Sequence, residues 1–132
     1  MTCALSCVGL LGFFFRNDQR SFPAMHSLDL ASCKQLRNMT IGKAAVACPK
    51  LQSLRLAYFE HLSDEAVQAI AFTLRGLTHI DVSFCRFLSD AAIASIATNC
   101  TKLFSLDISH CDKVHTLQTV IPFIMLFYCC RY

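Results

Sequence analysis

At 132 residues, the chain is long enough for one modest domain with a real hydrophobic core. A hydrophobic fraction of 55% with only 16% charged residues excludes a disordered chain. The net charge of +3, without any cluster of Lys or Arg, gives no indication of a nucleic-acid-binding surface.

The chain begins with an apolar stretch, residues 5–15. This stretch is shorter than the roughly 18 to 20 apolar residues that a transmembrane helix needs, so membrane contact is not expected. It has the length of a signal-peptide core, but no Lys or Arg precedes it. We interpret residues 1–21 as an apolar tail or a partial repeat.

A segment of the form apolar-x-x-apolar-x-apolar then occurs four times. The copies start at Met25, Leu51, Leu77 and Leu103, and each start lies 26 residues after the last, with no insertion or deletion. Alternating apolar and polar residues are typical of a short strand with one buried face. Four copies in register predict one repeat domain over residues 22–114.

A helical pattern follows the strand segment, most clearly in residues 62–71 and 88–97. Apolar residues there recur at spacings of three and four, which predicts helices with one buried face. The Ser-Asp pairs at 63–64 and 89–90 lie where helix N-caps are expected.

A strand and a helix of this length cannot bury their apolar faces alone, so the units must stack. We therefore expect an α/β fold, a solenoid of about four 26-residue repeats with parallel strands on the concave face and helices on the convex face. Three columns of apolar residues, one from each unit, should line its interior: Leu28, Leu54, Ile80 and Leu106; Leu30, Leu56, Val82 and Ile108; and Ile41, Val67 and Ile93.

Residues 77–103 contain the most complete copy of the unit: L-x-x-[LI]-D-[LV]-S-x-C, then L-S-D-x-A-[IV]-x-x-I-A, then N-C-x-x-L. This pattern resembles the cysteine-containing class of leucine-rich repeats, best known from F-box and leucine-rich repeat proteins. The resemblance covers about residues 22–114. It implies a solenoid that binds other proteins and selects substrates for an SCF ubiquitin ligase.

In that family, an F-box elsewhere in the chain binds the ligase core. No F-box is recognisable in this sequence, and residues 1–22 are too few to form one. The resemblance implies a substrate-recognition role, with a protein partner on the concave face and the ubiquitin ligase core as a possible second partner. Two alternatives remain open: a structural or scaffold repeat subunit, and a truncated fragment of a longer repeat protein.

The nine cysteines include three, Cys33, Cys85 and Cys111, that occupy the same position in successive units. Phe59 takes that position in the second unit, which interrupts any cysteine ladder. Zinc sites normally have paired ligands, and the repeat region has no C-x-x-C motif. We expect reduced thiols that pack inward against the loop backbone, no metal or cofactor, and a cytoplasmic or nuclear location.

Polar residues on the opposite strand face form columns of their own. Parallel strands lie about 4.8 Å apart, so Arg55 should pair with both Asp29 and Asp81, whereas Asp107 has no such neighbour. These residues either belong to the repeat pattern as partly exposed groups or form a strip that contacts a partner.

The strand ends carry Ser32, Tyr58, Phe84 and His110 in one further column. Tyr58 and Phe84 are plausible interface anchors because aromatic side chains bury a large area at a small entropic cost. The alternative is that they only cover an edge of the solenoid. The predicted partner-binding residues are Arg55, Tyr58, His79, Asp81, Phe84, Asp107 and His110.

The sequence has no recognisable catalytic motif. G-x-S-x-G, H-E-x-x-H, the P-loop and the dinucleotide fingerprint are all missing. Among the histidines, His61, His79, His110 and His115 have no Asp and nucleophile in a recognisable order around them. We expect a binding protein without catalytic residues.

The pattern ends near His115. Thr119 and Pro122 stand where the helix frame requires apolar residues, and proline inside a helix costs roughly 3 kcal/mol. We interpret residues 115–132 as an apolar tail outside the pattern. Because a solenoid needs polar ends, the apolar ends predict that the chain is part of a longer repeat array.

Overall fold

A computed structural model of the protein describes residues 21–115. Strands and helices alternate through this part of the chain. The proposed tails, residues 1–21 and 115–132, lie outside it except for Ser21 and His115. The elements are β1 (Ser27–Asp29), α2 (Asn38–Ala47), β2 (Ser53–Arg55), α3 (Asp64–Thr73), β3 (His79–Asp81), α4 (Asp90–Asn99) and β4 (Ser105–Asp107).

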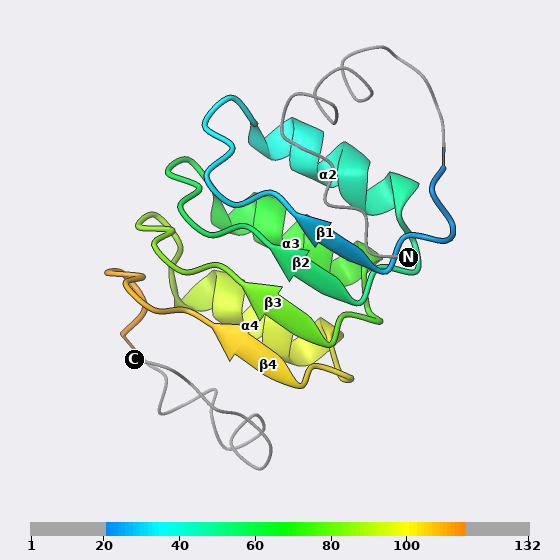
Figure 1. The fold of residues 1–132 in the computed structure, drawn as a ribbon. Coiled ribbons are helices and arrows are strands. Elements are labelled where there is room, and N and C mark those ends of the chain that lie inside the picture. Colours follow the sequence, from blue (N-terminus) through cyan, green and yellow to red (C-terminus); the bar gives the residue numbers. More distant parts are fainter. Residues whose placement is uncertain (1–20, 116–132) are drawn as a thin grey trace.

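The four strands form one parallel sheet in the order β1-β2-β3-β4, and the three helices all lie against the same face of it (Figure 1). Parallel strands need a crossover connection, and here each crossover contains a helix. The register is constant: Leu28, Leu54, Ile80 and Leu106 are direct cross-strand partners. The predicted alternation of strand and helix, and the alignment of the apolar columns, are confirmed.

The core lies between the sheet and the helices. The middle residue of every strand points into it, with exposed fractions between 1% for Leu28 and 5% for Ile80. Helix residues close it from the other side, among them Ile41, Val67 and Ile93. All three predicted columns therefore lie in one continuous apolar cluster.

Serine side chains begin two of the helices as predicted. Ser63 Oγ accepts a hydrogen bond from the Ala66 amide at 3.3 Å, and Ser89 Oγ accepts one from the Ala91 amide at 3.3 Å. Each satisfies an amide that the helix leaves without a partner. Arg37 takes this position before α2 and gives no side-chain cap.

The residue after each cap position links one unit to the next, which the sequence did not predict. Asp64 Oδ1 accepts a hydrogen bond from the Ser89 amide at 2.9 Å, and Asp90 Oδ1 accepts one from the His115 amide at 2.9 Å. Asn38 does the same for the Ser63 amide at 3.3 Å. These bonds keep the helix starts aligned at the same spacing as the strands.

The two faces of a strand can be compared at adjacent residues. We expect Ile80→Ala to lower the free energy of unfolding by about 2 to 5 kcal/mol, because the substitution leaves a cavity in the core. His79→Ala, on the exposed face of the same strand, should change it by no more than about 0.5 kcal/mol. Urea unfolding followed by circular dichroism measures both, and equal effects would contradict this assignment of the faces.

Candidate protein-binding surface

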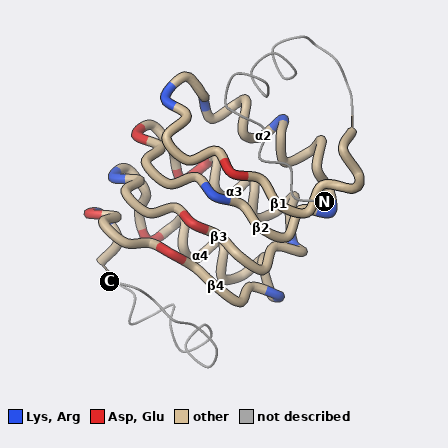
Figure 2. The backbone as a smooth tube through the Cα atoms, viewed as in Figure 1, with Lys and Arg blue, Asp and Glu red and all other residues tan. Residues whose placement is uncertain are grey.

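The sheet face away from the helices, here called the open face, carries a strip of charged residues at the strand ends. Figure 2 shows acidic residues at the ends of β1, β3 and β4 and a basic residue at the end of β2. These are Asp29, Arg55, Asp81 and Asp107, here called the aspartate strip, and the constant register makes them direct neighbours.

Arg55 pairs with both adjacent aspartates, as predicted. Its Nε lies 3.0 Å from Asp81 Oδ2, and its Nη1 lies 3.4 Å from Asp29 Oδ2. The hydrogen bond that Arg55 donates to Asp81 and the charge of Asp29 raise the pKa of the Arg55 guanidinium. Because Arg55 is half exposed, these pairs contribute little to stability but fix the direction in which its side chain points.

The aspartates also close the turn that follows each strand. Asp81 Oδ1 accepts hydrogen bonds from the Ser83 amide at 3.0 Å and the Ser83 hydroxyl at 2.6 Å. Asp107 Oδ1 binds Ser109 in the same way, at 2.9 Å and 2.6 Å. Such bonds to the backbone two residues ahead are typical of Asp in turns. One carboxylate oxygen of each is therefore used by the fold.

Three aromatic rings stack along the edge of the open face, one in the turn that follows each of β2, β3 and β4. The centroids of Tyr58 and Phe84 are 4.3 Å apart with 11° between the ring planes, and those of Phe84 and His110 are 4.2 Å apart with 22° between the planes. Tyr58 remains 49% exposed. The predicted neighbours therefore form one continuous ring column, here called the aromatic stack, at the edge of the open face.

The backbone beneath the stack adopts a conformation that residues other than glycine rarely take. Ser32, Tyr58, Phe84 and His110 have φ angles between 58° and 62°, in the left-handed region. Backbone hydrogen bonds between units support them: the Ser32 amide binds the Ala57 carbonyl at 2.9 Å, and the Phe84 amide binds the Ser109 carbonyl at 2.8 Å. The rings are thus presented on a backbone that is held in place from unit to unit.

Cysteines support this edge from inside. Cys85 Sγ donates to the Leu56 carbonyl at 3.3 Å, and Cys111 Sγ donates to the Val82 carbonyl at 3.2 Å, so each thiol bonds to the backbone of the preceding unit. The predicted inward packing of these two residues is confirmed. Burial raises the pKa of Cys85 to about 12 and that of Cys111 to about 11. Both thiols are therefore neutral near pH 7.

Cys33 differs from the other repeat cysteines. It is buried, but it is disulfide-bonded, whereas Cys48, Cys85, Cys100 and Cys111 are free. The expectation of reduced repeat cysteines is therefore wrong at Cys33. The position of Cys33 in the repeat predicted that its side chain packs inward, but it gave no indication of the disulfide bond.

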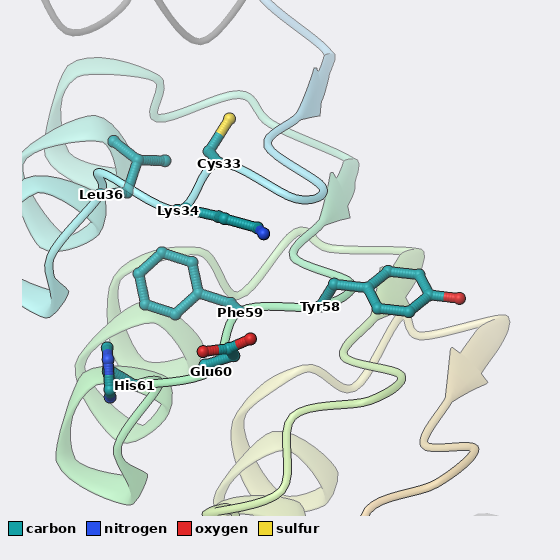
Figure 3. Close-up of a pocket in the computed structure, with 7 residues that line it drawn as sticks. All are labelled: Cys33, Lys34, Leu36, Tyr58, Phe59, Glu60 and His61. Carbon is teal, nitrogen blue, oxygen red and sulfur yellow. The ribbon is translucent and has the colours of Figure 1, made fainter.

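A small, open hollow of about 30 Å³ lies between the turns after β1 and β2. Tyr58 points out of it, away from Phe59 and His61 (Figure 3). Pockets for small molecules usually measure about 300 to 1,000 Å³ and enclose most of the ligand. The hollow is therefore too small to enclose a small-molecule ligand. Its lining residues are Cys33, Lys34, Leu36, Tyr58, Phe59, Glu60 and His61.

Six of the seven predicted site residues form two linked groups, Arg55, Asp81 and Asp107 in the aspartate strip and Tyr58, Phe84 and His110 in the aromatic stack. His79 lies two residues before Asp81 in β3, so it is on the same open face, and its ring centroid lies 5.7 Å from that of Phe104. Sequence reasoning missed Ser83 and Ser109 as partners of the aspartates, although the repeated D-x-S pattern was a usable signal.

Within residues 21–115, no three His, Cys, Asp or Glu side chains are grouped to hold a metal ion. No helix in that part of the chain is long and apolar enough to cross a membrane. No protein-family model matches the sequence, and no curated protein matches it significantly.

Glycine substitutions separate backbone strain from ring stacking. Ser32→Gly should raise the free energy of unfolding by about 0.5 to 1 kcal/mol, because left-handed backbone costs other residues more than glycine loses through flexibility. Phe84→Gly relieves the same strain but removes two stacked pairs, so it should lower the free energy by about 1 kcal/mol. Urea unfolding measures both, and stabilisation by both variants would show that the stack contributes nothing.

The buried thiols should resist alkylation in the folded protein. Iodoacetamide reacts with thiolates, and burial keeps Cys85 and Cys100 neutral at pH 8. We expect peptides containing them to stay unmodified in native buffer and to be fully modified in guanidinium chloride, as measured by site-resolved mass spectrometry. Rapid native labelling of Cys85 would contradict its burial beneath the turn.

Proposed function

We propose that the protein is a protein-binding module built as a leucine-rich repeat solenoid, with the sheet on its concave side. The constant 26-residue register, the parallel strands and the helices on one face of the sheet support this architecture. Repeat arrays of this kind offer an extended surface whose side chains are set by repeat position. The open face is that surface here.

The observation that carries the proposal is the aromatic stack. Tyr58, Phe84 and His110 lie in contact on a left-handed backbone, and the end ring is half exposed to solvent. Aromatic residues are enriched at the centres of protein interfaces, where they contribute much of the binding energy. Strained backbone also concentrates at functional positions.

By its resemblance to F-box and leucine-rich repeat proteins, we further propose substrate recognition for an SCF ubiquitin ligase. The open face would hold the substrate, and the ligase core would be reached through an F-box that this sequence does not contain. Cytoplasmic or nuclear location accompanies this proposal. Binding of substrates without a cullin-based core would instead favour a scaffold subunit.

Partner capture tests the role of the stack. We expect Tyr58→Ala with Phe84→Ala to reduce recovery of specific partners at least about tenfold, since each anchor contributes on the order of 1 to 2 kcal/mol. The measurement is quantitative mass spectrometry after affinity capture from cell extract. Alanine, unlike glycine, adds no backbone flexibility at these two left-handed positions, so the substitutions alter the backbone as little as possible.

Phe72→Ala is the matched control, because Phe72 is an exposed aromatic on α3, on the helix side of the molecule, with 64% exposure. It should leave capture unchanged. If the double variant folds normally by circular dichroism and retains all partners, the open face is not the binding surface. The same preparations show whether a cullin-based ligase core is present.

A further inference from the structure

Asp107 is the member of the aspartate strip that no cation neutralises within residues 21–115. Both ion pairs in that part of the chain involve Arg55, and neither includes Asp107. Its cross-strand partner is Asp81, a like charge, and like charges directly opposite each other are unfavourable. With three aspartates and one arginine, the strip has a net charge of −2.

Asp107 has one carboxylate oxygen, Oδ2, that takes part in none of the ion pairs within residues 21–115. Ser109 donates both its amide and its hydroxyl to Asp107 Oδ1. Asp81 uses Oδ1 in the same way and gives Oδ2 to Arg55 at 3.0 Å. By this comparison, Asp107 Oδ2 stands where a guanidinium would bind.

The protein contains a template for such binding one unit earlier. There, Arg55 pairs with Asp81, and the rings of Tyr58 and Phe84, three residues further along the same two units, stack on each other. One unit later, Asp81 stands in place of Arg55 and Asp107 in place of Asp81, and Phe84 stacks on His110. No arginine of the described residues pairs with Asp107 in this second arrangement. A guanidinium group suits this arrangement, because guanidinium groups bind carboxylates and also lie flat against aromatic rings.

We propose that the open face binds a segment of a partner protein that presents an arginine side chain. The guanidinium pairs with Asp107 Oδ2 and lies against the edge of the aromatic stack at Phe84 and His110. The charge of the strip selects a basic segment, and the rings favour arginine over lysine. This inference rests on the proposed protein-binding function and adds the chemistry of the partner.

NMR titration of isotope-labelled protein tests it with three synthetic peptides. Each peptide has nine residues. Every third residue is Arg in the first peptide, Lys in the second and Glu in the third, and the other residues are Gly and Ser. The arginine peptide should bind most tightly and shift the amide signals of Ser109 and His110, and the glutamate peptide should not bind. Asp107→Asn should weaken the arginine peptide about threefold, as for an exposed ion pair, while its amide oxygen still accepts from Ser109.

Glu65→Gln is the control, because it makes the same change of charge on α3, on the helix side. It should leave the affinity for the arginine peptide unchanged. Equal binding of the arginine and lysine peptides, equal losses in the two variants, or shifts confined to the helices would each overturn the inference. If Asp107→Asn leaves peptide binding unchanged while partner capture still requires Tyr58 and Phe84, the inference fails and the proposed function stands. If capture does not require the stack, the proposed function itself fails.

Discussion

Every feature of this protein depends on the stacking of equal units at a fixed register. A strand of three residues and a helix of ten cannot bury an apolar face alone. Leu54 and Ile80 are shielded only because the next unit places an equivalent side chain beside each of them. The hydrogen bonds that Asp64 and Asp90 accept from the next unit repeat the same spacing at the helix starts. Each unit is therefore stabilised by its neighbours.

Fixed register also determines the chemistry of the surface. Residues 26 positions apart become lateral neighbours, so a change in one unit alters its contacts with the units on both sides. Arg55 replaces aspartate in one unit and thereby pairs with two carboxylates. Tyr58, Phe84 and His110 become a stack for the same reason. The surface can thus vary from unit to unit while the core remains the same.

Periodicity explains how much of this could be predicted from the sequence. The apolar columns, the strand-helix alternation and the pairing of Arg55 with two aspartates follow from spacing alone. The left-handed backbone at Tyr58 and Phe84 could not be foreseen, because these residues do not favour it and only the bonds between units impose it. The disulfide of Cys33 was missed for a related reason. Position in a repeat predicts burial but not the covalent state of a side chain.

Residue types alone do not decide whether the strand-end aspartates are structural or available to bind a partner. Asp at the strand end is part of the repeat because Oδ1 closes the turn, as Asp81 and Asp107 show with Ser83 and Ser109. This role leaves the second carboxylate oxygen free to bind a group outside the unit. In Asp81, that oxygen pairs with Arg55. A structural and a binding role therefore do not compete for the same atom. In Asp81 and Asp107, the turn uses one carboxylate oxygen and leaves the other on the open face, which also carries the aromatic stack at its edge.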